Sequence, residues 1–467
     1  MTTIVAAFAL TAGMVADAAG GQLVAGRASR EFVSVSIDSR TLPADALFIA
    51  IEGERFDGHA YVADVIGHGA AGVLVSRVPD HSNGAAIIVV NDTLIALQRL
   101  AQHVRVRSGA KLVAVTGSAG KTTTKEVAAD FLSARHRVFR NHGNLNNHIG
   151  LPMSLLELRH GADVAVVELG MNHVGEIRTL VNIARPDVRV WTNVGDAHIG
   201  FFASKSAIAD AKAEILEQAR PSDLLVANAD DPLVMDHARR FTGRLVTFGE
   251  HDGADVKATH VVDRGFDGTE CQVDTALGRC HLTVPLAGRA QLSNVLAAAA
   301  VAVEFGVRLD DIEARAAQLR AVNRRGALFV MASGARLVDD SYNASPSATH
   351  AMLRALQATA TPGRRIAVLG EMLELGDAAY SLHEACGRAA VSANVDTLVV
   401  IGGAAAGGFA DGAAAAGLDR VRIHRFDTSE AAADAVPSLV GPGDLVLVKG
   451  SRGTRTDIVA DRLKAVA

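Results

Sequence analysis

The stretch KLVAVTGSAGKTTTKE, residues 111–126, decides the fold. Its apolar part, Lys111 to Thr116, is typical of a buried strand, and a glycine loop and a Lys-Thr pair follow directly. In such a unit, backbone N–H groups of the loop and of the next helix face a phosphate. Lys121 adds a positive charge, and the Thr122 hydroxyl is a suitable oxygen ligand for Mg²⁺. The stretch predicts a parallel α/β sheet with a phosphate site at its edge.

The phosphate loop is a shortened form. The standard pattern has a further glycine at the position of Val115. A glycine turn followed by an ordinary helix with an exposed lysine would use similar residues, but the preceding strand and the run of threonines favour phosphate binding. We expect these residues to bind the phosphates of ATP: Gly117, Ser118, Ala119, Gly120, Lys121, Thr122 and Thr123.

Composition narrows the class of protein. The 467 residues suggest two to four domains at about 100–200 residues each. With 49% hydrophobic and 21% charged residues, the chain can form buried cores. The net charge of −5 is spread over mixed charges without a basic stripe, so no nucleic-acid partner is expected. No apolar run reaches the ~18 residues needed to span a bilayer.

Cysteine usage and the N-terminus bear on location. Cys271, Cys280 and Cys386 have no metal-ligand spacing and make a disulfide framework improbable. The apolar segment from Thr3 to Val15 has no basic residue before it, and Asp17 follows closely, which argues against an export signal. We therefore expect a cytoplasmic protein, and we expect it to act as a monomer.

Strand-like runs divide the chain into three α/β parts. We expect a small domain over residues 1–104, a central domain over 105–320 after a linker at 103–109, and a third domain over 321–467. The first has expected strands at 32–37, 47–51 and 86–90. The central domain has apolar runs of the buried parallel type at 162–169, 188–193 and 224–228. The third has strands at 336–340, 365–370, 397–402 and 444–450, the pattern of a doubly wound, Rossmann-like fold.

Polar side chains near the ends of these runs are candidates for chemistry. Glu168 ends an apolar strand, where a carboxylate faces the crevice that binds ligands in such sheets, and where it could hold Mg²⁺; a surface or capping role is the alternative. His198 follows the strand that ends at Asn193, and its chemistry alone leaves a hydrogen-bonding role open. Lys212 lies in a helical pattern, and the residues alone favour a solvated lysine near Glu214.

Longer motifs resemble a known family. GSAGKTTTKE at 117–126 is similar to the ATP loop of the Mur ligases, cytoplasmic enzymes that build the peptide stem of the bacterial cell-wall precursor. Other motifs resemble the branch of that family that joins D-alanyl-D-alanine to UDP-N-acetylmuramoyl-tripeptide. They are GNLNNHIGLP at 143–152, VELGMNHVGEI at 167–177, TNVGDAHIGFF at 192–202, DDSYNASP at 339–346, AVLGEMLELG at 367–376 and LVKGSRG at 447–453.

The resemblance implies a fold and a reaction. The fold would be α/β in three domains: a small UDP-binding domain, a central P-loop-type ATPase domain with a mostly parallel sheet, and a C-terminal Rossmann-like domain. The reaction would be ATP-dependent amide formation through an acyl phosphate, the final cytoplasmic step of peptidoglycan precursor synthesis. It would use ATP and one or two Mg²⁺ ions. Because ATP contacts would come from two domains, we expect the domains to close on binding.

The resemblance also implies roles for single residues. The catalytic residues would be Lys121, Glu168, His198, Lys212 and Arg325. The metal ligands would be Thr122, Glu168, His198 and Lys212, the last carbamylated by CO₂. A neutral amine is needed for that modification, so a desolvated, metal-rich site would favour it.

Further ATP contacts would come from Asn294, Arg325 and Asp340. The chain departs from the family pattern before Asn294, where Ala290 replaces a histidine and Gln291 an asparagine. It also departs at Arg324, which replaces a glycine and leaves the choice between Arg324 and Arg325 open.

The same resemblance assigns substrate contacts. Ser39 and Arg40 would bind uridine diphosphate, although a surface turn is the alternative for both. Asn146 and Asn147 would contact the UDP-sugar-peptide, and an ordinary turn is again the alternative. The incoming dipeptide would be bound by Tyr342, Asn343 and Ser345.

Other functions remain open at this point. A sister Mur ligase or a folylpolyglutamate-type ligase would use another amine. A P-loop ATPase without ligase activity would hydrolyse ATP to move or bind a partner. A degenerate homologue could serve as a scaffold, although the presence of Lys121, Thr122, Glu168 and His198 argues against that.

Overall fold

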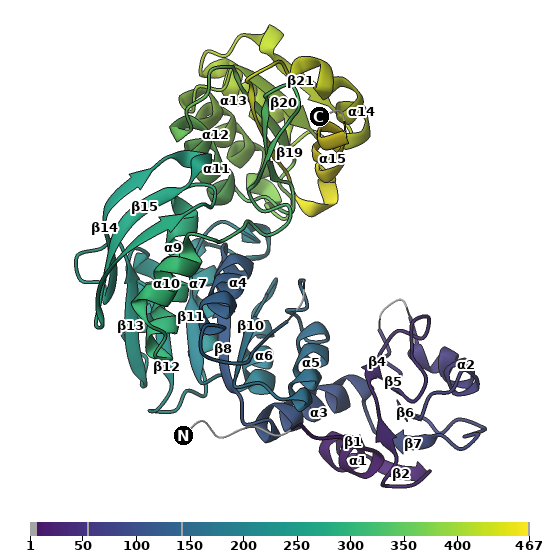
Figure 1. The fold of residues 1–467 in the computed structure, drawn as a ribbon. Helices are drawn as coiled ribbons and strands as arrows, with labels where there is room; N and C mark the ends of the chain where they lie inside the picture. The colour runs from purple at the N-terminus through teal and green to yellow at the C-terminus, as the bar shows by residue number, and fades with distance from the viewer. Residues whose placement is uncertain (1–6, 54–55, 142, 466–467) are drawn as a thin grey trace.

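The computed structural model describes residues 7–53, 56–141 and 143–465, and it forms three α/β parts that follow one another along the chain (Figure 1). Of the apolar N-terminal segment, residues 3–6 lie outside the described residues. The segment continues into helix α1 (Ala12–Ala19), which Thr11 caps through a hydrogen bond from the N–H of Met14. No helix of the described ranges is both long and apolar enough to cross a membrane.

The N-terminal part is built on a five-stranded sheet of order β2-β7-β6-β5-β4. Its strands are β2 (Gln22–Ala25), β4 (Val35–Ser36), β5 (Leu47–Ile49), β6 (Gly72–Val75) and β7 (Ala86–Val89). The single strand expected at 32–37 is wrong. Its first end forms β3 (Glu31–Phe32), which pairs antiparallel with β1 (Leu10–Thr11), whereas β4 pairs parallel with β5. The chain breaks because the two ends join different sheets.

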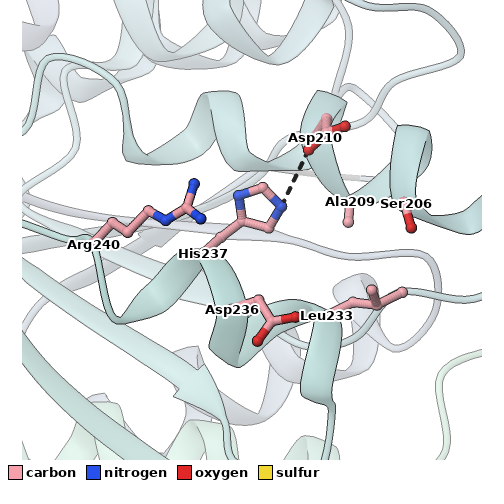
Figure 2. A pocket seen from close by; sticks show the side chains of 7 residues that line it. All are labelled: Ser206, Ala209, Asp210, Leu233, Asp236, His237 and Arg240. Atoms are coloured by element: carbon pink, nitrogen blue, oxygen red, sulfur yellow. Dashed lines mark ion pairs between the residues drawn. The ribbon is translucent and has the colours of Figure 1, made fainter.

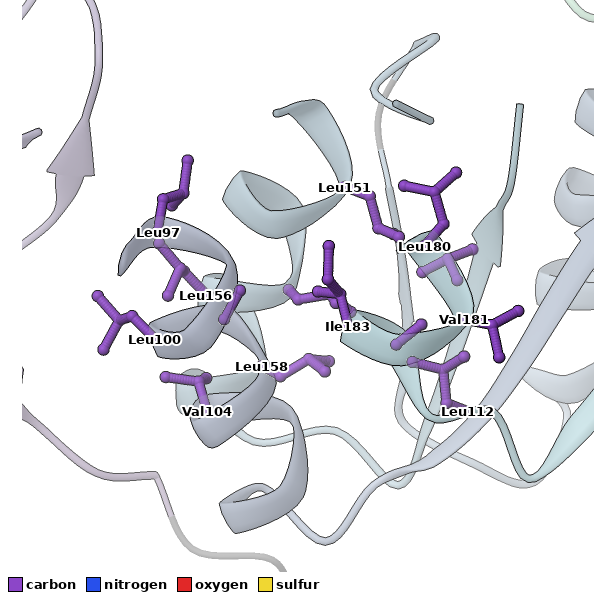
Figure 3. Close-up of a cluster of buried hydrophobic side chains, with 14 of the residues drawn as sticks. Leu97, Leu100, Val104, Leu112, Leu151, Leu156, Leu158, Leu180, Val181 and Ile183 are labelled. Atoms are coloured by element: carbon purple, nitrogen blue, oxygen red, sulfur yellow. The ribbon is translucent and has the colours of Figure 1, made fainter. Parts of the chain in front are cut away.

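Helix α3 (Thr93–Arg107) joins the N-terminal and central parts without a linker, so the linker expected at 103–109 is wrong. Leu97, Leu100 and Val104 are buried in one apolar core with residues of the central part (Figure 3). Arg105, which suggested a solvated connection, is buried. Its guanidinium donates to the carbonyls of Ala110 and Ala184 and to the Asp187 carboxylate.

The central part contains a nine-stranded sheet of order β16-β15-β14-β13-β12-β11-β8-β10-β9. It is parallel from β9 to β14 and antiparallel beyond. The strands are β8 (Lys111–Thr116), β9 (Val138–Arg140), β10 (Val164–Glu168), β11 (Val188–Trp191), β12 (Leu224–Asn228), β13 (Arg244–Gly249), β14 (Val256–Asp263), β15 (Thr269–Thr275) and β16 (Gly278–Val284).

Both faces of the central sheet are covered, which explains its continuous apolar runs. Along β8, Leu112 and Ala114 lie in the core shared with α3, α5 (Gly150–Leu155) and α6 (Glu176–Ala184). Val113 and Val115 lie in the opposite core. There α4 (Lys121–Leu132) packs against the Ala-rich α9 (Arg289–Glu304).

The C-terminal part has a six-stranded sheet of order β17-β18-β22-β19-β20-β21, parallel except for the β17–β18 pair. All four strands expected here are present: β18 (Arg336–Asp340), β19 (Arg365–Gly370), β20 (Thr397–Ile401) and β22 (Leu445–Lys449). Two further strands, β17 (Ala327–Val330) and β21 (Ile423–Phe426), form the edges. The covering helices are α11 (Pro346–Ala358), α12 (Ala379–Ser392), α13 (Gly407–Ala415), α14 (Ser429–Ala435) and α15 (Asp457–Ala465).

Hydrogen bonds join the C-terminal part to the central part near Phe266 and near the phosphate loop. Phe266 lies in the C-terminal core, and its N–H donates to the Thr359 hydroxyl over 2.8 Å. Nearer the phosphate loop, the N–H of Gly200 donates to the Glu374 carbonyl over 2.9 Å, beside Gly376. The second contact places the loop that contains His198 against the edge of the C-terminal part.

Candidate active site

The phosphate loop leaves β8 and is enclosed by two neighbouring elements. A Cβ added to Gly117, whose φ is +147°, would lie 2.0 Å from the Thr192 hydroxyl oxygen. A Cβ added to Gly120, whose φ is +82°, would lie 2.0 Å from the Asn294 amide oxygen. Only glycine allows this path between the end of β11 and helix α9.

Helix α4 begins at Lys121, directly after the loop. The first N–H groups of a helix have no acceptor within it, and they carry the positive end of the helix dipole. The Lys121 ammonium folds back and donates to the Gly117 carbonyl over 2.8 Å. The loop thus presents backbone donors and one cation to the same space, as phosphate binding requires.

Glu168 ends β10 with a buried carboxylate beside this loop. One of its oxygens accepts from the Thr122 hydroxyl over 2.7 Å, and the other accepts from the Asn146 amide over 2.8 Å. Two of the expected metal ligands therefore lie in contact, and both offer the oxygen atoms that Mg²⁺ prefers.

Within the described residues, no group of three or more His, Cys, Asp or Glu side chains could hold a metal by itself. Mg²⁺ in nucleotide sites typically takes one or two carboxylates and completes its shell with phosphates and water. Thr122 and Glu168 are therefore compatible with Mg²⁺ bound together with a nucleotide.

Lys212 lies on α7 (Lys205–Ala213) and is only 2% exposed. The solvated lysine that the local pattern favoured is therefore wrong. Glu214 does not pair with it, because its carboxylate accepts from the N–H groups of Gly175 and Arg178 at the start of α6. Burial, and then the charge of Lys121, lower the pKa of Lys212 well below its usual value.

His198 meets the C-terminal part at the edge of the site. Its Nδ1 lies 2.5 Å from a carboxylate oxygen of Glu374, and both residues have positive φ. Burial and the charge of Lys121 lower the pKa of His198, and Glu374 opposes the shift. A neutral imidazole that donates Nδ1–H to Glu374 has its Nε2 free to accept or to ligate.

The two adjacent arginines have different surroundings. Arg324 is bound to the carboxylates of Asp457 and Asp461 on α15. Arg325 stacks on Tyr342, with its guanidinium carbon 3.9 Å from the ring centre, and its charge contributes to lowering the pKa of Lys121. Burial is the main cause of that shift. The geometry therefore favours Arg325 as the arginine that faces the phosphates.

Asp340 and Asn294, two candidate nucleotide contacts, form hydrogen bonds to neighbouring side chains. The Asp340 carboxylate accepts from the Lys449 ammonium over 2.6 Å, and burial raises the pKa of Asp340 against the effect of that lysine. The Asn294 amide nitrogen donates to the Gln291 side chain over 2.9 Å. Gln291 thus helps to orient Asn294 over the loop.

The other expected substrate residues do not gather at the phosphate loop. Arg40 is held by Asp38 through two hydrogen bonds of 2.9 and 2.7 Å, and Ser39 lies between them in the N-terminal part. The Asn147 side chain accepts from the first N–H groups of α5. Ser345 is the N-cap residue of α11, and the Asn343 carbonyl accepts from Lys449.

A separate cavity of about 210 Å³ lies between α7 and α8 (Pro232–Ala238) (Figure 2). His237 and Asp210 face each other across it at 3.3 Å. None of the expected site residues lines this cavity, so we assign it no part in the reaction.

Sequence reasoning missed three residues near the site. The Asn193 side chain bonds to the loop at Ala119. Asn141, whose carbonyl accepts from the fully buried Lys125, bonds through its side chain to the N–H of Glu168. Asn193 could have been found by the signal that singled out Glu168, a polar side chain where a buried strand ends. Glu374 lies in the motif at 367–376, but nothing in that motif indicated that it contacts His198.

Models of the Mur ligase family match most of the chain. The Mur ligase middle domain matches residues 115–302, the Mur ligase glutamate ligase domain matches 295–452, and the Mur ligase family catalytic domain matches 31–114. A UDP-N-acetylmuramoyl-tripeptide--D-alanyl-D-alanine ligase of Bacillus subtilis (strain 168) is 33% identical over 439 residues, which cover 92% of this chain and 93% of the relative. The chain belongs to the Mur ligase family.

Solved structures share its whole fold. MurF from Acinetobacter baumannii has a TM-score of 0.89 and 31% identity, over 98% of this chain and 99% of that one. MurF ligase from Thermotoga maritima in complex with ADP has a TM-score of 0.82 and 29% identity, over 93% and 97%. The expected α/β fold in three domains is thereby confirmed.

Proposed function

We propose that this Mur ligase joins D-alanyl-D-alanine to UDP-N-acetylmuramoyl-tripeptide with the consumption of ATP. The observation that carries the proposal is the group formed by Lys121 with the buried Thr122 and Glu168 at the sheet edge, in a chain that matches a ligase of that name over 92% of its length. The product would be the precursor of the peptidoglycan stem.

The reaction needs an activated carboxylate, because a free carboxylate is a poor electrophile. An oxygen of the tripeptide's terminal carboxylate attacks the γ phosphorus of ATP, ADP leaves, and an acyl phosphate forms. The free amine of D-alanyl-D-alanine then attacks the acyl carbon, and inorganic phosphate leaves as the amide bond forms. Positioning and charge stabilisation supply most of the catalysis in phosphoryl transfer.

The chain's own groups divide this work. The loop N–H groups and the first turn of α4 bind and orient the triphosphate. Lys121 and Arg325 offset the charge that shifts toward the leaving phosphates. Thr122 and Glu168 would hold Mg²⁺, with His198 and Lys212 at a second ion, and bound metal supplies further charge neutralisation.

Carbamylation of Lys212 is part of the proposal. A carbamate forms from a neutral amine, and the burial that lowers the pKa of Lys212 favours that form. The modification would convert that amine into an anion that could orient metal.

Each of the three parts of the chain would bind a different portion of the substrates. We assign the uridine diphosphate to residues 1–104, with Ser39 and Arg40 as contacts. ATP would bind to residues 105–320, with Arg325 and Asp340 of the C-terminal part as further contacts, and the dipeptide would bind to residues 321–467. Arg40 would have to exchange Asp38 for the pyrophosphate. Asn146 lies against Glu168 and would contact the peptide end of the UDP substrate.

We also propose a monomer in the cytoplasm. Three cysteines in 467 residues are too few for a disulfide framework, and this cysteine usage supports a reducing compartment.

The test is ADP release by the purified protein with Mg·ATP, UDP-N-acetylmuramoyl-tripeptide and D-alanyl-D-alanine, each omitted in turn. We expect turnover only when all are present. ADP release without either acceptor substrate would favour a simple ATPase. Equal turnover with a single amino acid in place of the dipeptide would favour a sister ligase.

A further inference from the structure

Asn193, two residues beyond the end of β11, binds both backbone polar groups of one residue in the phosphate loop, Ala119. The N–H of Ala119 donates to its side-chain oxygen over 2.9 Å, and its side-chain amide donates to the Ala119 carbonyl over 3.1 Å. Its own carbonyl accepts from the N–H of Ser118 over 3.0 Å. Asn193 therefore makes three hydrogen bonds to two consecutive loop residues.

These bonds decide which loop groups remain for a ligand. The N–H groups of Ser118 and Ala119 point to Asn193 and are already satisfied. The donors left for phosphate are those that begin at Gly120 and continue into the first turn of α4. In the arrangement seen here, the N–H groups of Ser118 and Ala119, two residues expected to bind ATP, donate to Asn193.

Asn193 is held in place from the far side. The N–H of Val194 donates to the Asp231 carboxylate over 2.7 Å, and the Thr192 carbonyl accepts from the Asn228 amide over 2.8 Å. The segment that carries Asn193 is thus fixed to the end of β12. A fixed support can set the shape of the loop, whereas a mobile one would follow it.

We propose that Asn193 is a positioning residue for the phosphate loop. The loop lacks the first glycine of the longer pattern, and Asn193, just beyond the end of β11, supplies the contacts that orient its peptide units. The inference rests on the proposed use of ATP and deepens it. It separates the loop into a part that Asn193 shapes, Ser118 and Ala119, and a part that grips phosphate, Gly120 to Thr122.

The test is direct titration of Mg·ATP into the wild type and into Asn193→Ala and Asn193→Asp. Loss of two neutral hydrogen bonds should weaken ATP binding about 10- to 30-fold. Asn193→Asp keeps the shape but turns a carboxylate toward the Ala119 carbonyl and the phosphates, so we expect it to bind ATP more weakly still. In steady state the KM for ATP should rise while the KM for the UDP substrate stays unchanged.

Asn182→Ala, on α6, is the matched control. It removes the hydrogen bond that the Asn182 side-chain oxygen accepts from the Gln218 amide, and it touches neither the loop nor residues 192–194. We expect wild-type ATP affinity. Equal weakening of ATP binding in this control, or wild-type affinity in a folded Asn193→Asp, would overturn the inference. A wild type that binds no ATP would refute the proposed function itself.

Discussion

Among single residues, Lys212 combines deep burial with the lack of an opposite charge acting on it. It is 2% exposed, and the charge that acts on its pKa is the like charge of Lys121. An unpaired buried amine is costly, so Lys212→Met, of similar length, should raise the free energy of unfolding by roughly 1–4 kcal/mol. Ligase turnover should be lost. Denaturant unfolding in bicarbonate-free buffer and the ADP-release assay measure the two effects.

The pH dependence of this effect has a definite sign. The folded pKa of Lys212 lies below its unfolded value, so the folded state binds fewer protons between the two. Wild-type stability should therefore rise with pH through that window, up to about pH 10.4, whereas Lys212→Met gains nothing there. The difference in free energy of unfolding between Lys212→Met and wild type should therefore become smaller between neutral pH and about pH 10.4. A difference in free energy of unfolding that does not change with pH would contradict the prediction that Lys212 is uncharged in the folded protein.

The arginine pair offers a second comparison at this scale. Arg325→Ala removes a cation that acts on Lys121 and should lower kcat/KM for ATP by about 100-fold. Arg324→Ala breaks partly exposed ion pairs to α15 and should cost about 0–1 kcal/mol of stability with little change in kinetics. Steady-state kinetics and thermal unfolding of both variants show which of the two arginines contacts the phosphates. The reverse pattern would assign the phosphate contact to Arg324.

At the scale of elements, the sequence predicted best where local pattern and burial agree. The apolar runs that became β10, β12 and β19 are covered on both faces, and such burial leaves a clear composition. Glu168 was predictable because it ends such a run. The prediction of a linker at the end of α3 was wrong because the groups that accept hydrogen bonds from the buried Arg105 lie up to 82 residues away in the sequence. The His198–Glu374 contact joins residues 176 positions apart, and no local pattern encodes it.

Helix α3 should make the N-terminal and central parts unfold together. Leu100 is fully buried in a core that also contains Trp191, the only tryptophan of the chain. Leu100→Ala should cost about 2–5 kcal/mol and shift the unfolding transition seen by Trp191 fluorescence. Ile95→Ala, on the same helix but 42% exposed, should leave that transition in place. An unchanged Trp191 transition in Leu100→Ala would show that the two parts are not coupled.

At the scale of the whole molecule, the contact between Gly200 and the Glu374–Gly376 turn brings the C-terminal part against the site. The same short segment carries His198, and its start, at Asn193, binds the phosphate loop. A chain of contacts therefore runs from the loop, through residues 193–200, to the C-terminal sheet. Residues expected to bind ATP lie on both sides of this contact, Lys121 on one and Arg325 on the other. Closure at Gly200 would thus complete the nucleotide site.

Gly200→Ala tests whether that closure is needed. An added Cβ would lie 2.6 Å from the Gly376 nitrogen and 2.8 Å from the Glu374 carbonyl oxygen, so the two parts must separate. A misplacement of about 1 Å can cost on the order of 100-fold in rate, so kcat should fall by about that factor. Binding of ATP to the central part should weaken far less, and scattering should show less compaction with both substrates present. Gly67→Ala, whose added methyl group meets nothing within 4 Å, is the control and should keep wild-type kcat. Wild-type kcat in Gly200→Ala would mean that the reaction does not need this contact.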